Sequence, residues 1–304
     1  MHHVSRIDWS FADDPLPPSA TSVGLARSKL IGPDQGAVHT DLLAVALHPD
    51  GWLAPHVHSF EEAIYLLDGE LHVLIGETVH RLVAGDYALF PTAVRHGLGG
   101  SGDRPARFLS LASPQRVAPN AGRKDTFFEP VSSSYRADLA ARAERPAFGS
   151  PTLRFVGHYD GTGPQLETLR IQDAARGRAP AGRDTALVVY SGISVKMLVD
   201  SAFGADQTTM FTVDYEVGGA AQAHDHPFEE AYVFLAGEIQ GELDGQTYTF
   251  RAGDVAFAPT GCVHGFWNEG TERVRWLETQ APQPPTRHSY RWVGDWERFE
   301  ETHR

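Results

Sequence analysis

Hydrophobic and polar residues alternate over short runs along most of the chain, and glycine, proline or aspartate interrupts these runs. Alternation with a period of two is typical of β-strands with one buried face. The runs are also rich in valine, tyrosine, phenylalanine and threonine, which favour strands. Strands are expected within residues 40–51, 61–82, 86–93, 186–200, 208–219, 229–250 and 254–261. Many short strands with regular turns predict an all-β fold, built as antiparallel sandwiches or barrels.

One pattern occurs twice in the chain. The stretch HVHSFEEAIYLLDGE begins at His56, and HDHPFEEAYVFLAGE begins at His224, 168 residues later. The same offset relates further pairs without an insertion, namely His58 and His226, Glu62 and Glu230, Gly69 and Gly237, Gly85 and Gly253, Pro91 and Pro259, and His96 and His264. The chain therefore consists of two copies of one module, which indicates a duplication. Within the second copy, Asp244-Gly245 predicts a hairpin turn.

A segment of different composition separates the copies. Residues 113–151 contain prolines at both ends, and Ser134 is expected to cap a short helix near residues 135–144. The expected division is an N-terminal barrel with its extension at 1–112, a linker at 113–151, and a C-terminal barrel at 152–304. The last residues, 295–304, are expected to form a tail helix that packs across the outside of a barrel.

The repeated histidines have the spacing of a metal site. Residues two apart in a strand face the same side, so His224 and His226 are expected to point together into the module. Glu230 follows on the adjoining strand, and His264 comes from a later strand pair. The first copy offers the matching residues His56, His58, Glu62 and His96. Three neutral imidazoles and one carboxylate suit a divalent first-row metal, so iron, manganese, nickel, copper or zinc is expected, with up to two ions per chain.

The same alternation predicts which side chains surround each metal. In the second copy these are Gln222, Tyr232 and Phe266; their counterparts in the first copy are Ala54, Ile64 and Leu98. The space around each predicted metal site, inside its barrel, is called a cup. The second cup is the more polar one, and it is expected to carry the chemistry. Tyr232 would donate a proton or orient a substrate oxygen beside Gln222, and Phe266 would line the substrate pocket. The alternative is that Tyr232 and Phe266 only fill the barrel. Glu61 and Glu229, which precede the ligand glutamates, are expected to face solvent.

Composition narrows the partners and the compartment. The chain has 304 residues and a net charge of −13, which opposes binding to nucleic acid or to anionic membrane surfaces. No apolar run is long enough to span a bilayer, and the first twenty residues lack an apolar signal core. Cys262 is the only cysteine, so an intrachain disulfide is impossible. These features indicate a cytoplasmic protein that acts on a small molecule.

The motifs resemble those of bicupins in the cupin superfamily, in which two jelly-roll (double-stranded β-helix) barrels follow one another. The second copy matches both cupin motifs throughout, with Gly218, His224, His226, Glu230 and Gly237 in the first, and Gly253, Pro259, Gly261, His264 and Asn268 in the second. The first copy departs at Gly51, which lies one residue too close to His56, and at Ala93 and Gly100, which replace glycine and asparagine. None of these departures removes a ligand.

The resemblance implies a metal-dependent enzyme, first of all a dioxygenase of the quercetinase-like or ring-cleaving type. Oxalate decarboxylase-like bicupins share the ligands, but the acidic lid residue of that type is not located in this sequence. A second implication is a manganese-dependent hydrolase or isomerase similar to ureidoglycine aminohydrolase, whose ligand set differs from the one here. A third is a metal-stabilised binding protein without catalysis. Association of cupins through barrel edges would allow a homodimer, which no residue here demonstrates.

Overall fold

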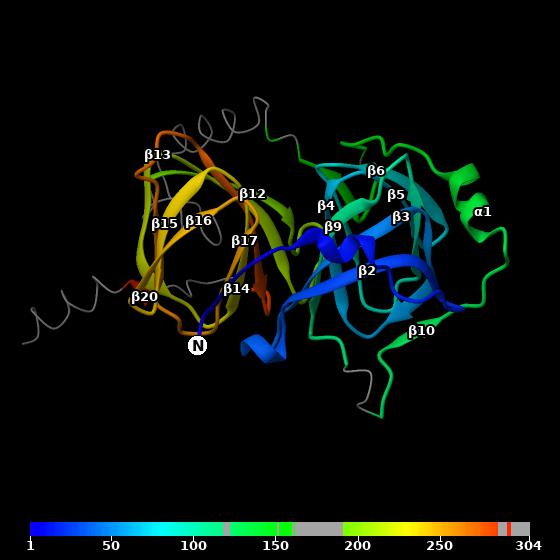
Figure 1. Cartoon of the computed structure of the whole chain (residues 1–304), viewed down its shortest axis with the longest axis horizontal. Helices are drawn as coiled ribbons and strands as arrows, with labels where there is room; N and C mark the ends of the chain where they lie inside the picture. The colour runs from blue at the N-terminus through cyan, green and yellow to red at the C-terminus, as the bar shows by residue number, and fades with distance from the viewer. Residues whose placement is uncertain (118–121, 151, 160, 162–190, 285–290, 293–304) are drawn as a thin grey trace, which may run out of the picture.

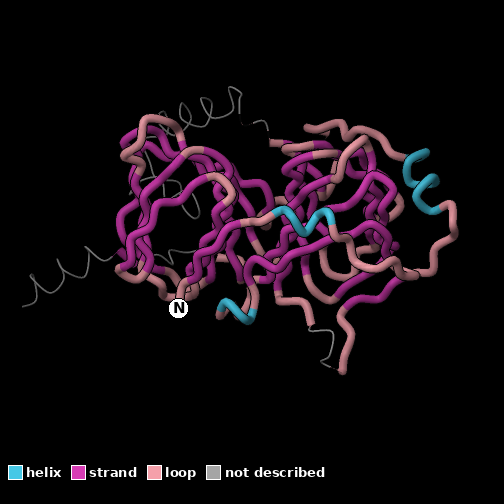
Figure 2. Tube along the Cα trace, in the orientation of Figure 1, coloured by secondary structure: helices cyan, strands magenta, loops and turns pink. Residues whose placement is uncertain are grey.

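Two curled antiparallel β-sheets lie side by side as two barrels in the computed structural model of the chain (Figure 1). The structure describes residues 1–117, 122–150, 152–159, 161, 191–284 and 291–292. Strands make up most of this part of the chain, and its helices are few and short (Figure 2). The expected all-β class with two tandem jelly-roll barrels and a short helix in the linker is confirmed.

The first barrel has the strand order β11-β7-β4-β9-β3-β8-β5-β6, and β2 and β10 also pair with β3. Its strands are β2 (Ser22–Ile31), β3 (Asp41–His58), β4 (Glu61–Asp68), β5 (Glu70–Ile75), β6 (Thr78–Val83), β7 (Asp86–Phe90), β8 (His96–Ser101), β9 (Ala106–Ser113), β10 (Thr126–Phe128) and β11 (Val156–His158). Two 3-10 turns, Trp9–Asp13 and Pro33–Gln35, flank β2.

The second barrel repeats this order as β1-β17-β14-β19-β13-β18-β15-β16, and β12 and β20 also pair with β13. Its strands are β1 (His3–Arg6), β12 (Ser191–Val199), β13 (Thr209–Asp225), β14 (Glu229–Ala236), β15 (Glu238–Leu243), β16 (Gln246–Arg251), β17 (Asp254–Ala258), β18 (His264–Trp267), β19 (Val274–Ala281) and β20 (Arg291–Trp292). The turn between β15 and β16 has Asp244 at φ 48° and Gly245 at φ 78°. Positive φ at both positions is what a two-residue hairpin needs, which confirms the Asp-Gly turn.

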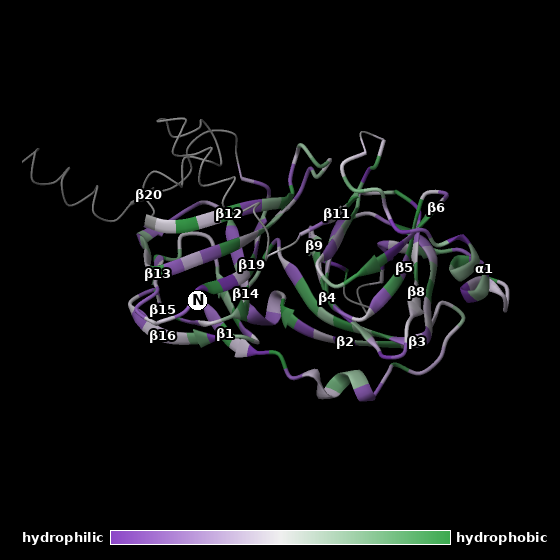
Figure 3. Cartoon of the chain, turned by 90° about the horizontal axis from the view of Figure 1, so that it is seen from above, coloured by the Kyte–Doolittle hydropathy of each residue, from purple (hydrophilic) through white to green (hydrophobic). Residues whose placement is uncertain are grey.

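Alternation along the strands produces three apolar layers, and Figure 3 shows strands that change between hydrophobic and hydrophilic along their length. One layer fills the first barrel around Phe90 and Phe108, and a second fills the other barrel around Phe250 and Trp276. The third layer lies between the barrels. It joins residues of β4, β7 and β9 to residues of β14, β17 and β19, with Leu89 and Phe257 fully buried in it. The two barrels therefore share one apolar interface.

Strand pairing crosses the division that the sequence suggested in two places. β1, within the extension that was grouped with the first barrel, pairs with β17 of the second barrel. β11, which was grouped with the second barrel, pairs with β7 of the first. Sequence alternation does not identify which edge an end segment joins, because any open edge offers the same backbone groups. Each barrel thus completes its sheet with a strand from beyond its own module.

The linker helix is α1 (Tyr135–Arg142), and it lies on the outer side of the first barrel (Figure 1). Leu139 of this helix is buried against Leu74 and Val79. Ser134 is at the N-cap position, but its hydroxyl donates to the Asp138 carboxylate (2.9 Å) instead of accepting a backbone N–H. The expected cap is therefore wrong in its bond, although the helix begins where expected.

The expected tail helix at 295–304 lies outside the described residues. Within the part of the chain that the structure describes, no helix is both long and apolar enough to cross a membrane.

Candidate metal centres

Each barrel holds three histidines at one end of its interior. His56, His58 and His96 form one group and His224, His226 and His264 the other, and in each group one ring nitrogen per residue lies within 4.8 Å of the others. All six side chains are buried. The alternation that placed both histidines of each His-x-His pair on one face of β3 or β13 therefore describes their geometry well.

Backbone carbonyls fix the tautomer of every one of these rings. In the first cup the Nδ1 atoms of His56, His58 and His96 lie 2.8, 2.6 and 2.9 Å from carbonyl oxygens two residues away. In the second cup the same contacts of His224, His226 and His264 measure 2.8, 2.8 and 3.0 Å. A carbonyl only accepts, so each Nδ1 carries the proton, and each Nε2 keeps its lone pair.

Burial keeps His96 and His224 uncharged. Burial together with the neighbouring rings of His56 and His58 lowers the pKa of His96 to about 3. Burial and the nearby His264 ring likewise lower the pKa of His224 to about 3. The Nε2 atom of His96 is buried and has no hydrogen-bond partner among the residues that the structure describes. A buried nitrogen lone pair without a donor is costly unless a cation meets it, so the donor set fits a divalent metal in each cup.

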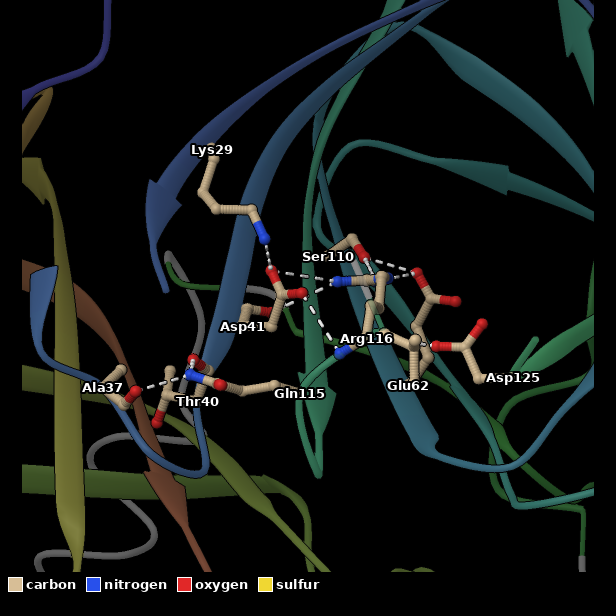
Figure 4. Close-up of polar contacts among 10 residues, drawn as sticks. Lys29, Ala37, Thr40, Asp41, Glu62, Ser110, Gln115, Arg116 and Asp125 are labelled. Carbon is tan, nitrogen blue, oxygen red and sulfur yellow. Dashed lines mark hydrogen bonds and ion pairs between the residues drawn. The ribbon is translucent and has the colours of Figure 1, made fainter. Parts of the chain in front are cut away.

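The carboxylate of the first cup is Glu62, and a guanidinium and a hydroxyl hold it. Its Oε1 accepts hydrogen bonds from Arg116 Nη2 (2.8 Å) and from the Ser110 hydroxyl, while its Oε2 lies 3.4 Å from His58 Nε2 (Figure 4). Burial alone would raise the pKa of Glu62, but Arg116 and His58 outweigh it and hold that pKa well below the usual range. One oxygen is thus anchored, and the other faces the histidines.

The carboxylate of the second cup is Glu230, and its partners differ. Its Oε1 accepts from Gln280 Nε2 (2.6 Å), and its Oε2 accepts from the Tyr232 hydroxyl. The same Oε2 lies 2.9 Å from His226 Nε2 and 3.2 Å from His264 Nε2. The structure therefore brings all four expected ligands of each cup together, and it places Tyr232 on a ligand.

The second cup is filled by large side chains. Tyr232, Phe266 and Trp276 are each at most 2% exposed and pack together in the core of the barrel. Trp276 lies inside the barrel and donates its Nε1–H to Glu278 (2.8 Å). Burial and the nearby Glu230 raise the pKa of Glu278 well above its usual range.

Gln222 does not lie where the alternation predicts. A β-bulge interrupts the pairing of β13 with β18 between Ala221 and His224, so the period of two is broken before the ligand pair. Gln222 is exposed, and Ala221 takes the buried position opposite Phe266. The expectation that Gln222 shares the ligand face is wrong for this reason.

An open cavity of about 250 Å³ lies in the first cup. His56 and Glu62 reach it from the metal centre, Arg27 and Arg116 bring positive charge, and Asp125 brings a further carboxylate. Its other lining residues are mainly apolar, and they include Leu43, Leu53, Leu98, Phe60, Phe108 and Phe128. Of the three residues that were expected around this metal, Leu98 lines the cavity, while Ala54 and Ile64 are buried.

Several cavity residues were missed from the sequence. Phe60 stacks on the His58 ring with centroids 3.8 Å apart, and Phe128 lies 4.8 Å from the His56 ring. Arg116 and Phe128 come from the segment that was interpreted as a linker, where β10 pairs with β3 beside the His-x-His pair. Ser110 could have been found, because it alternates with Phe108 on β9. Composition gives no such signal for the linker residues.

A third cluster brings His2, Asp244 and Cys262 together on the second barrel. Burial and the neighbouring Asp244 raise the pKa of the Cys262 thiol to about 12. The thiol is therefore protonated, and Cys262 is a small buried residue.

The family comparison agrees with this geometry. The model of the cupin domain matches residues 44–112 and again 211–279. The chain is 35% identical over 117 residues to the tetracenomycin polyketide synthase protein TcmJ of Streptomyces glaucescens, a match that covers 38% of this chain and 76% of that protein. It is 30% identical over 96 residues to the polyketide synthase CurC of Streptomyces cyaneus, where the match covers 30% of this chain and 62% of that protein, less than two thirds of its length. The chain belongs to the cupin family, and its two cupin domains make it a bicupin.

Solved structures share the two-barrel arrangement. A variant of salicylate 1,2-dioxygenase from Pseudoaminobacter salicylatoxidans, in complex with gentisate, superposes with a TM-score of 0.69 and 15% identity over 92% of this chain and 82% of that one. A variant of oxalate decarboxylase from Bacillus subtilis gives a TM-score of 0.61 and 16% identity over 99% of this chain and 83% of that one. At these identities the likeness establishes the fold.

Replacing Arg116 by methionine is expected to lower the free energy of unfolding of the metal-free protein by about 3 kcal/mol, because the partly buried Glu62 and the buried Asp41 lose a paired charge. Urea denaturation measures the change. Arg104→Met is the matched control, since Arg104 pairs with Asp68 in solvent and an exposed pair is worth at most about 1 kcal/mol. Equal losses in the two variants would contradict the anchoring of Glu62.

Proposed function

We propose that the chain is a metal-dependent enzyme whose first cup acts on a small oxygenated aromatic anion, most directly as a dioxygenase. One observation carries the proposal: the cavity of the first cup brings two metal ligands, His56 and Glu62, next to a cation, Arg27, inside apolar walls. A concave apolar pocket with a few convergent polar groups is the usual form of a small-molecule site. The preference for the second cup that the sequence suggested is given up here, because large side chains fill that cup.

Charge supports an anionic substrate. Among the residues that the structure describes, no carboxylate lies within ion-pair distance of Arg27, although Arg27 lines the cavity. Arg27 is exposed to solvent, and its guanidinium is a cation at neutral pH. Arg116 is already paired with Glu62 and Asp41. Arg27 is therefore the guanidinium that is available to bind a carboxylate or phenolate by charge-assisted hydrogen bonds.

The walls of the cavity support an aromatic substrate. Phe60 and Phe128 flank the ligand histidines, and aliphatic side chains of β2 and β3 line the cavity beyond them. Rings of this kind stack on a flat aromatic molecule and exclude water from it. The relatives named for polyketide synthases and the dioxygenase structure with bound gentisate point to the same class of substrate.

The residues of the first cup divide the work. A bound divalent metal would supply Lewis-acid and oxygen chemistry at the Nε2 atoms of the three histidines. Arg116 and Ser110 hold Glu62 by one oxygen, which keeps the other directed at that centre. Arg27 binds the anionic group of the substrate, and Phe60 and Phe128 orient its ring. The second cup, with Tyr232 tied to Glu230, is a metal centre that stabilises its barrel.

An assay of dissolved oxygen tests the proposal against its alternatives. Gentisate and salicylate are the first probes, with the metal-loaded protein and each of iron, manganese, nickel, copper and zinc. Oxygen uptake in step with loss of substrate supports the dioxygenase. Release of carbon dioxide without oxygen uptake from a carboxylic acid probe would favour a decarboxylase, and hydrolysis of ureidoglycine-like amides would favour a hydrolase. Stoichiometric metal with no turnover in any assay would favour a binding protein.

Replacing Arg27 by methionine is expected to raise KM for an anionic aromatic substrate by about 10- to 100-fold, because one charge-assisted hydrogen bond is lost. The value of kcat should change little, since Arg27 does not touch the metal ligands. Steady-state kinetics on gentisate measures the split. Arg104→Met, on the surface of the same barrel, should leave KM unchanged. An unaltered KM in the Arg27 variant would remove this residue from the substrate site.

A further inference from the structure

Glu61 and Glu229 are buried, contrary to the expectation that they face solvent. Each of the two residues is only 2% exposed. Each carboxylate accepts hydrogen bonds from a backbone segment of the opposite barrel. A carboxylate that is removed from water must be met by donors, because burial of an unpaired charge is costly. Both glutamates therefore have a role between the barrels.

Glu229, at the start of β14 in the second barrel, binds three consecutive backbone amides of the first barrel. The N–H groups of Val38, His39 and Thr40 donate to it at 2.6, 3.1 and 2.9 Å. This segment leads directly into β3, the strand that carries His56 and His58. The Gln115 amide holds the same segment from its own barrel, since its Nε2 donates to the carbonyls of Ala37 and Thr40 (Figure 4).

Glu61, at the start of β4 in the first barrel, makes the reciprocal contact. The N–H groups of Asp206, Gln207 and Thr208 donate to it at 2.7, 3.2 and 3.0 Å. This segment leads into β13, which carries His224 and His226. Each glutamate together with the three backbone amides that it binds is called a clamp. Every residue of one clamp lies 168 positions from its counterpart in the other, so the two clamps follow the duplication. The two barrels hold one another by the same contact made twice.

The first clamp continues to the metal carboxylate of the first cup. Thr40 is followed by Asp41, whose buried carboxylate lies 3.0 Å from Lys29 Nζ and 3.4 Å from Arg116 Nη1 (Figure 4). Arg116 in turn donates to Glu62 at 2.8 Å. A chain of polar contacts thus joins Glu229, the residue before ligand Glu230, to ligand Glu62 of the other barrel.

The second clamp continues to the metal carboxylate of the second cup. Thr208 is followed by Thr209, whose hydroxyl donates to Gln280 Oε1 at 3.0 Å. Gln280 Nε2 then donates to Glu230 at 2.6 Å. Glu61, the residue before ligand Glu62, is thereby joined to ligand Glu230. Each ligand glutamate is held through a side chain from its own barrel and lies next to a clamp that reaches the other barrel.

We propose that Glu61 and Glu229 are positioning residues that couple the two metal centres, so that a metal in one cup raises the affinity of the other cup. A metal that fixes Glu62 or Glu230 also fixes the start of β4 or β14, and with it the clamping carboxylate. The backbone segment held by that carboxylate lies in the opposite barrel. Its contacts to the ligand glutamate of that barrel are then ordered as well. Binding of the first ion bears the entropic cost of ordering these contacts. The second ion does not bear this cost again, so the two ions bind with positive cooperativity. The coupling does not depend on which reaction the enzyme performs.

Calorimetric titration of the metal-free full-length chain with Ni²⁺ tests the coupling. His264→Ala leaves only the first cup able to bind tightly, and His96→Ala leaves only the second. The product of the two stepwise dissociation constants of the unmodified chain is compared with the product of the single constants of these two variants. We expect the product for the unmodified chain to be lower by about fivefold or more, which is the lower end of ordinary coupling between sites.

The clamp variants then assign the coupling. In the Glu61→Gln and Glu229→Gln double variant, compared with its own single-cup variants, the ratio of products should return to one. Glu77→Gln, with its side chain 90% exposed, is the matched control and should keep the full ratio. Thr209→Val, which removes one hydroxyl from the second chain of contacts at nearly constant shape, should reduce the ratio if the double variant does not fold. A ratio of one in the unmodified chain, or a ratio that survives these clamp and hydroxyl changes, overturns the proposal.

Discussion

His96→Ala is expected to empty the first cup of metal and to lower turnover by about 10³-fold, because the metal contributes several kcal/mol to such a reaction. His96 donates its Nδ1–H to Val94 O and stacks at 4.3 Å on Phe90, so its Nε2 is held toward the centre. Alanine removes this metal-ligating nitrogen, so only His56, His58 and Glu62 remain to hold the metal. Plasma mass spectrometry should find one ion fewer per chain, and oxygen uptake should fall to the background rate.

His80→Ala is the control for this variant. His80 is buried in the same barrel but lies outside the ligand group, and burial lowers its pKa as it does for His96. It should therefore retain its full metal content and most of its turnover. Full activity in His96→Ala, or equal metal loss in both variants, would contradict the assignment of the first cup.

Phe257→Ala is expected to lower the free energy of unfolding by about 3 to 5 kcal/mol, the usual cost of deleting a buried aromatic ring. Phe257 is fully buried in the layer between the barrels and pairs with Ala231 of β14. The cavity that remains would loosen the interface on which both clamps depend. Urea denaturation followed by tryptophan fluorescence measures the loss.

Phe127→Ala provides the comparison for the interface. Phe127 is 58% exposed on β10, so its removal should change stability by no more than about 0.5 kcal/mol. Two separate unfolding transitions in the unmodified chain, with only one of them altered by Phe257→Ala, would show that the barrels fold independently and would contradict a shared core.

The duplication made most of the fold and the convergence of the six histidines predictable. Matched offsets in sequence carry over to matched positions in space, and His-x-His on a strand needs only the period of two to bring its rings together. The ligands were therefore found without knowledge of the long-range pairing. The same rule failed at Gln222, where a bulge inserts a residue into the ladder just before the ligand pair. A bulge leaves no reliable mark in composition.

The contacts between the two barrels could not be predicted from the sequence. Glu61 and Glu229 stand in a charged doublet, which usually means a solvated surface, yet their repetition at matched positions was a signal of a shared role. Arg116 and Phe128 lie in the segment that was interpreted as a linker. Arg116 follows the end of β9, and Phe128 reaches the first cup because β10 folds back onto β3. The sequence also did not reveal which of the two cups contains an open cavity. It depends on side-chain volume, with Phe108, Leu98 and Ile64 in one barrel where Trp276, Phe266 and Tyr232 stand in the other.

Metal content per chain tests the central claim most directly. Plasma mass spectrometry on the freshly purified chain, and on the His96→Ala and His264→Ala variants, counts the ions in each cup. The account predicts two divalent ions in the unmodified chain and one in each variant. No bound metal in the unmodified chain, and none after reconstitution with iron, manganese, nickel, copper or zinc, would contradict it.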